Sequence, residues 1–301
     1  MKAFFRKILP SPLWQILHKA KAAVNNFIID IKILLHMPLK KKRALLGFRI
    51  RAAEHCNLNC KGCNNFAPIA EPEFIDLNEL QRDIERLGEL FGHKCDYIYI
   101  TGGEALLHPE LTSIMRLART SFSTGDIYVF SNGILLSQQT DDFWNSCREH
   151  NINIICTAYP ININVEAIRA KAKAFGVEFE WAWGQKEHEI NTFVIEPINL
   201  AGNSNIKKNF ASCIRANNCV YLSHGRMYTC SFSVTLRHFN KYFGKNIPIT
   251  EADSINIYDE HITSDEIMRR LSEPIPLCRY CNLKRRIIDW GVSKHEISEW
   301  V

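Results

Sequence analysis

The sequence predicts an α/β fold, a partial (β/α)6 barrel of the TIM type, with a small cysteine-rich domain after it. Strand-like runs recur about every 25 to 30 residues with helical stretches between them, and polar or glycine-rich clusters follow three of those runs. At 301 residues with 46% hydrophobic residues, the chain is long enough for one large domain and an appendage. We expect a helical extension over residues 1–44, the barrel over 45–202 and the C-terminal domain over 203–301.

The predicted elements follow one another in the order that a parallel sheet requires. The expected strands lie at 48–53, 97–100, 127–130, 152–156, 177–181 and 192–195. Helical stretches separate the earlier strands, at 77–91, 109–119, 140–149 and 164–175. The first helix opens on Asp76 with Glu79 three residues later, a pattern typical of a helix cap, and Gly92 closes it.

Three cysteines follow the first strand within one short loop. Cys56, Cys60 and Cys63 have the spacing C-x3-C-x2-C, which supplies three soft ligands and leaves a tetrahedral metal cage incomplete. On a cubane iron–sulfur cluster, three thiolates hold three irons and leave the fourth iron open. A zinc site or buried free thiols are the alternatives that the spacing alone leaves open.

Two further clusters lie just past the next two expected strands. Gly102, Gly103 and Glu104 follow the strand at 97–100, and Ser131 and Asn132 follow the strand at 127–130. The carboxyl ends of parallel strands carry the active site in β/α folds. We expect the glycines to let backbone approach a ligand, and Glu104 to accept a hydrogen bond from a ligand ammonium. Each cluster taken singly is also an ordinary turn.

The three clusters together resemble the radical S-adenosylmethionine (radical SAM) superfamily. The resemblance implies that Cys56, Cys60 and Cys63 hold a [4Fe-4S] cluster whose open iron binds SAM, and that reduction of the cluster releases a 5′-deoxyadenosyl radical. It further implies that the segment Gly102, Gly103 and Glu104 holds the SAM amino group. An electron donor such as flavodoxin or ferredoxin is implied as a partner.

Ser131 and Asn132 resemble the segment of that family which meets the SAM carboxylate or ribose. One position departs from the family pattern. An aromatic residue usually precedes the third cysteine and packs near the adenine, whereas Gly62 stands there in this chain. Phe66 is our candidate substitute for the adenine contact.

A second group of cysteines lies in the C-terminal third of the chain. Residues 220–229 predict a β-hairpin with His224 and Gly225 as its two-residue loop. In that register Cys219 lies opposite Cys230, and both thiols leave one face. Downstream, Cys278 and Cys281 form a C-x2-C pair, so hairpin and pair together predict a metal site.

This group is similar to the twitch or SPASM appendages of radical SAM enzymes, which bind auxiliary clusters. Their spacing fits Cys213, Gly225 and Cys230, which implies a second [4Fe-4S] cluster, one rather than two. Five cysteines compete for four places: Cys230, Cys278 and Cys281 are the firmest, the resemblance favours Cys213, and the hairpin register favours Cys219. A structural zinc is the alternative, because zinc ribbons also combine hairpins with C-x2-C.

The N-terminal segment concentrates positive charge. Residues 1–47 carry ten Lys and Arg against the single Asp30, so this segment is +9 within a chain of net charge +5. An apolar stripe runs along the predicted helix; its members are Leu17, Ala20, Val24, Phe27, Ile31 and Leu34. We expect either peripheral docking to an anionic membrane or acidic partner, or a helix packed on the barrel with its basic side solvated.

Composition also limits compartment and partners. Eleven cysteines without a signal peptide, and no apolar run long enough to cross a bilayer, predict a cytoplasmic protein, peripheral to a membrane if the helix docks. No interleaving of aromatic and basic residues indicates nucleic acid.

Cys95 and Cys147 are interpreted as buried thiols and Cys156 as a core thiol at a strand end, with contact to substrate as its alternative. Trp181, Trp183 and Glu196 lie near strand ends and are candidates to line a substrate cavity.

The function that follows from the resemblance is a radical SAM enzyme that abstracts hydrogen from a substrate, which remains unknown. A small molecule, such as a sugar or a cell-envelope precursor, is favoured over a ribosomal peptide, because the N-terminal segment is short for a peptide-recognition module. The alternative of another class is a non-catalytic metal-binding interaction protein on a radical SAM-like barrel.

Overall fold

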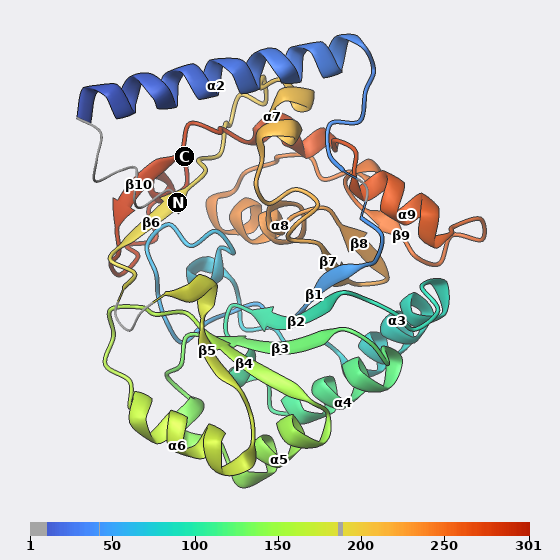
Figure 1. Ribbon diagram of the computed structural model, residues 1–301, viewed down its shortest axis with the longest axis vertical. Helices are drawn as coiled ribbons and strands as arrows, with labels where there is room; N and C mark the ends of the chain where they lie inside the picture. Colours follow the sequence, from blue (N-terminus) through green and yellow to red (C-terminus); the bar gives the residue numbers. More distant parts are fainter. Residues whose placement is uncertain (1–10, 42, 186–188) are drawn as a thin grey trace.

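The computed structural model describes residues 11–41, 43–185 and 189–301. Its main sheet has eight strands in the order β5-β4-β3-β2-β1-β7-β8-β9, and β10 and β6 form a second sheet (Figure 1). The strands are β1 (Gly47–Ala53), β2 (Tyr97–Gly102), β3 (Asp126–Ser131), β4 (Ile152–Cys156), β5 (Phe179–Trp181), β6 (Thr192–Ile195), β7 (Tyr221–Ser223), β8 (Arg226–Tyr228), β9 (Ile255–Asn256) and β10 (Arg286–Asp289).

The α-helices are α2 (Ser11–Leu34), α3 (Leu77–Leu90), α4 (Leu111–Ser121), α5 (Asp141–Glu149), α6 (Val165–Phe175), α7 (Ile206–Ser212), α8 (Ser231–Phe243) and α9 (Ser264–Leu271). Short 3-10 helices include η2 (Ala105–Leu107) and η6 (Pro276–Tyr280). The expected cap on α3 is confirmed, since the Asp76 carboxylate accepts the Glu79 N–H at 2.8 Å.

Strands β1 to β5 pair in parallel, each with the next along the chain. Helices α3 to α6 cover one face of these strands (Figure 1). Alternate residues of β1, namely Phe48, Ile50 and Ala52, are fully buried in the core between sheet and helices. The prediction of an α/β fold with a mostly parallel sheet is therefore confirmed.

The placement of residues 192–195 as a strand of the barrel is wrong. The segment 192–195 does form a strand, but this strand, β6, leaves the main sheet and pairs antiparallel with β10. Nearly all residues of β1 to β4 are buried or half-buried, whereas Thr192 and Val194 of β6 are exposed. Strands β1 to β5, together with β7, therefore form the parallel part of the main sheet.

The predicted hairpin is confirmed, with Tyr221 opposite Tyr228 and Ser223 opposite Arg226. Its first strand, β7, pairs in parallel with β1 at the side away from β2, so the main sheet continues across the predicted boundary near residue 202. A second hydrophobic core joins Phe66, just after the cysteine loop, to Phe239 of α8 and to Trp300. The C-terminal third is thus packed directly against the end of β1.

Helix α2 lies along one edge of the molecule and contacts α7 (Figure 1). Its Asp30 forms an ion pair with Lys208 of α7 at 2.7 Å. The apolar stripe does not pack on the barrel as one interpretation required, because Val24, Phe27, Ile31 and Leu34 are exposed. Among the described residues, no helix is long and apolar enough to cross a membrane.

Candidate active site

The cysteine loop begins at the carboxyl end of β1. Two tight turns shape the loop: the Cys60 N–H donates to the Leu58 carbonyl at 3.1 Å, and the Cys63 N–H donates to the Cys60 carbonyl at 3.3 Å. Gly62 has a φ of 63°, the left-handed region that favours glycine. Burial raises the pKa of Cys56 and of Cys60 to about 12, so metal binding here must displace protons.

The two glycines at the end of β2, Gly102 and Gly103, pack against the backbone that leads into the cysteine loop. A Cβ on Gly103 would lie 2.1 Å from the His55 carbonyl oxygen, and one on Gly102 would lie 2.2 Å from the Ala53 carbonyl oxygen. The Gly103 N–H donates to Ala53 at 2.8 Å. The space that their missing side chains leave is filled by the backbone that leads into the cysteine loop. That these glycines let backbone approach a ligand stays a prediction.

Glu104 is a buried carboxylate at the centre of the strand ends. One of its oxygens accepts the Leu106 N–H at 3.1 Å and the other accepts the Asn132 N–H at 2.8 Å. Burial raises the pKa of Glu104 to about 7 against these hydrogen bonds, so a neighbouring cation would favour its ionised form.

Asn132 joins the third strand end to the cysteine loop. Its amide nitrogen donates to the Asn57 side-chain oxygen at 2.7 Å and lies 3.5 Å from the Cys56 sulfur. Ser131 accepts the Gly133 N–H through its hydroxyl oxygen at 2.9 Å. The three segments that the sequence singled out therefore meet at one end of the sheet.

The C-terminal segment holds the other side of the cysteine loop, and the sequence analysis missed it. Cys60 pairs with Val292 in an antiparallel bridge. The Glu299 carboxylate accepts the Gly62 N–H at 3.3 Å, and the Trp300 indole N–H donates to the Cys63 carbonyl at 2.9 Å. These hydrogen bonds join residues that are 237 positions apart, so no local sequence pattern predicts them.

Two aromatic side chains that the sequence analysis also missed face the thiols. The Trp290 indole N–H is a buried donor with no acceptor among the described residues. It lies beside Cys60, whose pKa it lowers against the larger effect of burial. Burial and the nearby thiols raise the pKa of Tyr159 well above its ordinary value, and its ring lies 6.4 Å from that of Trp290. A buried indole donor beside Cys60 suits a sulfur ligand that carries negative charge.

A buried ion cluster lies just before the cysteine loop. Arg51 donates three hydrogen bonds of 2.9 to 3.1 Å to the Glu54 carboxylate, and His238 of α8 contacts the same carboxylate at 2.6 Å. Burial alone would raise the pKa of Glu54, but Arg51 and His238 outweigh it and lower the pKa far below the ordinary value. This cluster ties the end of β1 to α8.

Four of the five C-terminal cysteines line one cavity: Cys213, Cys230, Cys278 and Cys281. The Asn209 side chain donates to the carbonyls of Cys278 and Cys281, at 2.7 and 2.6 Å. Cys219 does not line this cavity; it lies beside Arg49 and Tyr221 and is also near enough to Cys230 to raise the pKa of that thiol. The strand ladder ends at Tyr221 and Tyr228, so the register that favoured Cys219 does not extend to it.

Neither thiol set is arranged for a single ion. Among the residues in the described ranges, no three His, Cys, Asp or Glu side chains are grouped to hold one metal ion. Burial raises the pKa of Cys278 to about 12 and that of Cys230 to about 11. Four sulfur donors that line one cavity suit a bound metal centre.

Several predicted residues lie elsewhere. Phe66 is 3% exposed and its ring packs against Phe239 and Trp300, so the ring belongs to this core, and its contact with adenine stays a prediction. Glu196 pairs with Arg215 at 3.0 Å and Arg285 at 3.3 Å, near the second thiol group and not in a barrel cavity.

The other notable side chains of the sequence analysis belong to the core. Cys95, Cys147 and Cys156 are buried among apolar residues, as core packing predicted. Trp181 packs against the same core and lies beside Phe179, with ring centroids 5.4 Å apart. The side chain of Trp183 lies outside the described part of the structure.

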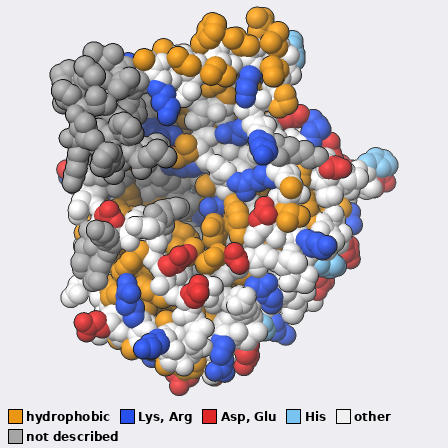
Figure 2. Space-filling model, in the orientation of Figure 1, with side chains coloured by type: hydrophobic (Ala, Val, Ile, Leu, Met, Phe, Trp, Pro, Cys, Tyr) orange, Lys and Arg blue, Asp and Glu red, His pale blue; other side chains and the backbone are white. Residues whose placement is uncertain are grey.

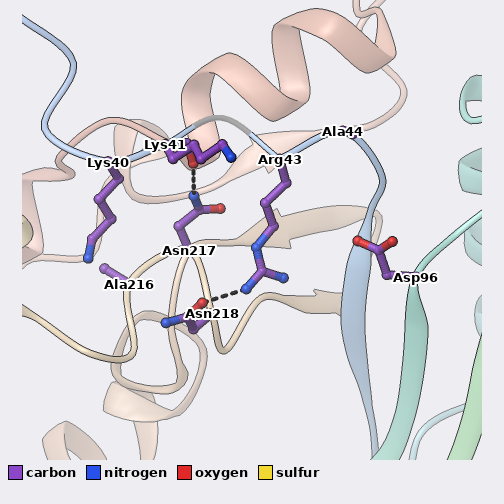
Figure 3. Close-up of a pocket in the computed structure, with 8 residues that line it drawn as sticks. All are labelled: Lys40, Lys41, Arg43, Ala44, Asp96, Ala216, Asn217 and Asn218. Atoms are coloured by element: carbon purple, nitrogen blue, oxygen red, sulfur yellow. Dashed lines mark hydrogen bonds between the residues drawn. The ribbon is translucent and has the colours of Figure 1, made fainter.

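A cavity of about 650 Å³ lies at the other end of the sheet (Figure 3). It is lined by Lys40, Lys41, Arg43, Ala44, Asp96, Ala216, Asn217 and Asn218. Arg43 donates to the Asn218 side chain, and Asn217 donates to the Lys41 carbonyl at 3.3 Å. Ala44 and Asp96 precede β1 and β2, so this cavity lies at the amino ends of the strands, away from the cysteine loop.

Residues 50–176 match the family described as the radical SAM superfamily. GTP 3′,8-cyclase of Chlorobaculum tepidum is 31% identical over 93 residues, which cover 31% of this chain and 27% of that protein. GTP 3′,8-cyclase of Desulforamulus reducens is 27% identical over 97 residues, which cover 31% of this chain and 29% of that protein. The chain thus spans less than a third of the length of these relatives.

Among solved structures, BtrN in complex with AdoMet and 2-DOIA aligns over 87% of this chain and 100% of that chain, with 14% identity and a TM-score of 0.47. The anSMEcpe structure with bound AdoMet aligns over 78% of this chain and 82% of that chain, with 12% identity and a TM-score of 0.46. The family match covers β1 to α6, including all three loop cysteines, Glu104 and Asn132. Residues 50–176 are therefore a radical SAM domain.

Proposed function

We propose that this chain binds a [4Fe-4S] cluster through Cys56, Cys60 and Cys63 and cleaves SAM reductively at that cluster. One observation carries the proposal: Asn132 lies 3.5 Å from the Cys56 sulfur and donates its backbone N–H to Glu104. Polar groups from two further strand ends thus border the thiol loop. Three thiolates leave one iron of a cubane cluster without a protein ligand, as SAM binding requires.

When bound, the cluster supplies the electron that breaks a carbon–sulfur bond of SAM, and the resulting 5′-deoxyadenosyl radical abstracts hydrogen from the substrate. The protein's own residues bind and orient SAM. Glu104 is poised to accept the SAM ammonium, because a cation beside a buried carboxyl with a pKa of about 7 favours its ionised form. Ser131 and Asn132 border the place of the SAM carboxylate or ribose. Tyr159 and Trp290 keep water from the thiols.

We further propose that Cys213, Cys230, Cys278 and Cys281 hold an auxiliary [4Fe-4S] cluster of the twitch or SPASM kind. Their convergence on one cavity supports four protein ligands and a closed coordination shell. A structural zinc at these thiols is the competing assignment.

Anaerobic reconstitution followed by counts of iron, sulfide and zinc tests both assignments. Wild type should bind about eight irons per chain, and Cys278→Ser/Cys281→Ser should bind about four. About four irons and one zinc in wild type would establish the zinc assignment. No cubane-type iron in either protein would overturn the proposal as a whole.

For the substrate, we propose a small molecule that carries a ring and an anionic group, such as a sugar derivative or a nucleotide. On the sheet face opposite α3 to α6, the Arg49 guanidinium lies 4.9 Å from the Tyr99 ring centroid. The Tyr99 ring also lies 5.6 Å from that of Tyr128 and 6.0 Å from that of Phe130. Arg49 also donates to the Asn218 carbonyl at 2.9 Å, so this group extends toward the amino ends of the strands. Its aromatic faces and its cation suit such a ligand. Two relatives are named GTP 3′,8-cyclase, and GTP is a small molecule that carries rings and phosphates, so their names also favour a small-molecule substrate.

Two other functions make different predictions. A ribosomal-peptide maturase would consume SAM only with a cysteine-containing or other precursor peptide present, and the small-molecule proposal predicts no such dependence. A non-catalytic metal-binding interaction protein would assemble its clusters and leave SAM intact under every reducing condition. The intact segment from Gly102 to Glu104 supports a catalytic chain.

A further inference from the structure

The outward face of α2 is a continuous apolar stripe. Val24 is 57% exposed, Phe27 66%, Ile31 38% and Leu34 75%. Figure 2 shows hydrophobic side chains gathered along this helix. Beyond the helix end, Leu35 and Met37 are exposed as well. A patch of large apolar side chains on the outside of a folded protein marks an interaction surface.

The geometry of α2 shows that this stripe points away from the protein. Successive helical residues are rotated by about 100°, so Ile29 and Ile33 lie on the side of the helix opposite Val24 and Ile31. Ile29 and Ile33 are half-buried, and Asp30 pairs with Lys208 of α7. The protein therefore holds α2 by its inner side and leaves the apolar stripe to a partner.

The positive charge beside the stripe favours a negatively charged partner. Lys21 and Lys32 border the stripe on one side of the helix. Asp30 is the single acidic residue among residues 1–47, and its carboxylate forms an ion pair with Lys208. A second copy of the chain docked through this face would bring lysines against lysines with no free carboxylate of α2 between them. A surface of negative charge over hydrocarbon matches both the lysines and the stripe.

We propose that α2 docks this protein on the surface of an anionic phospholipid bilayer, with the helix lying in the plane of the interface. The helix does not qualify as a membrane span, which fits an interfacial position. Phe27, Ile31 and Leu34 enter the boundary between headgroups and acyl chains, and Lys21 and Lys32 extend to the lipid phosphates. This docking is independent of the proposed reaction and holds for the protein with or without its clusters.

The test is co-sedimentation of the full chain with vesicles of phosphatidylcholine alone or mixed with phosphatidylglycerol. The variant Phe27→Glu/Ile31→Glu changes the stripe, and Ile249→Glu is the matched control because Ile249 is also exposed and lies far along the chain. Wild type and the control should bind the anionic vesicles, weakly at high salt, and the stripe variant should bind about tenfold more weakly or not at all.

Three results would overturn the proposal: no binding of wild type to anionic vesicles, equal binding of the stripe variant, or equal binding to phosphatidylcholine alone. Light scattering after size-exclusion chromatography tests whether a second copy of the chain, and not a bilayer, covers the stripe. A dimer that the stripe variant splits, together with no vesicle binding, would assign the stripe to a second copy. Equal melting temperatures of the two variants would confirm that a loss of binding is not a loss of fold.

Discussion

Glu299→Ala removes the carboxylate that connects the C-terminal segment to the cysteine loop. Glu299 is 4% exposed and accepts hydrogen bonds from the Gly62 N–H at 3.3 Å, the Ser293 hydroxyl at 2.7 Å and the Lys294 N–H at 2.6 Å. The donors at Gly62 and Ser293 are buried, and each costs about 1–3 kcal/mol when it loses its acceptor. We therefore expect the free energy of unfolding to fall by about 3 kcal/mol.

The assay is urea unfolding of the metal-free protein, with Glu296→Ala as the control because Glu296 is exposed in the same segment. Burial alone would raise the pKa of Glu299, but its hydrogen bonds outweigh burial and lower it. A lowered pKa stabilises the fold above the unfolded-state value of about 4.3, so the difference from wild type should shrink as pH falls below about 4. A loss no larger than that of Glu296→Ala at pH 7 would refute the reasoning.

Three other predictions concern the two thiol sites. Gly103→Ala should lower the free energy of unfolding by about 1–3 kcal/mol and reduce iron loading, because its Cβ would lie 2.1 Å from a backbone oxygen; an unchanged urea midpoint would count against this. Glu54→Gln should cost about 3–5 kcal/mol because it leaves a buried arginine unpaired, whereas Glu73→Gln, at a half-exposed ion pair, should cost under about 1 kcal/mol in the same urea titration. Cys213→Ser should lower the iron count of the reconstituted protein and Cys219→Ser should leave it unchanged; the opposite pattern would exchange their assignments.

Local patterns in the sequence predicted the elements well. The β/α units and the hairpin loop at His224 and Gly225 depend on periodicity and turn chemistry that neighbouring residues carry. The meeting of Cys56, Glu104 and Asn132 could also be predicted, because parallel strands bring their carboxyl ends to one edge of a sheet.

Long-range pairing could not be predicted in this way. β6 pairs with β10 and not with the main sheet, and this pairing joins residues far apart in the chain. The contacts of Glu299 and Trp300 with the cysteine loop are also long-range. Phe66 was assigned by its place after the loop, but its ring is taken by a core that includes α8 and Trp300. Extending the hairpin register to Cys219 failed because strand pairing stops at Tyr221.

The central claim is that the loop of Cys56, Cys60 and Cys63 holds a cluster at which SAM is split. Its most direct test is the yield of 5′-deoxyadenosine from anaerobically reconstituted protein with SAM and a strong reductant, compared between wild type and Cys60→Ala. We predict 5′-deoxyadenosine from wild type and none from Cys60→Ala. Undiminished 5′-deoxyadenosine from Cys60→Ala, or none from wild type carrying a full complement of iron and sulfide, would contradict the claim.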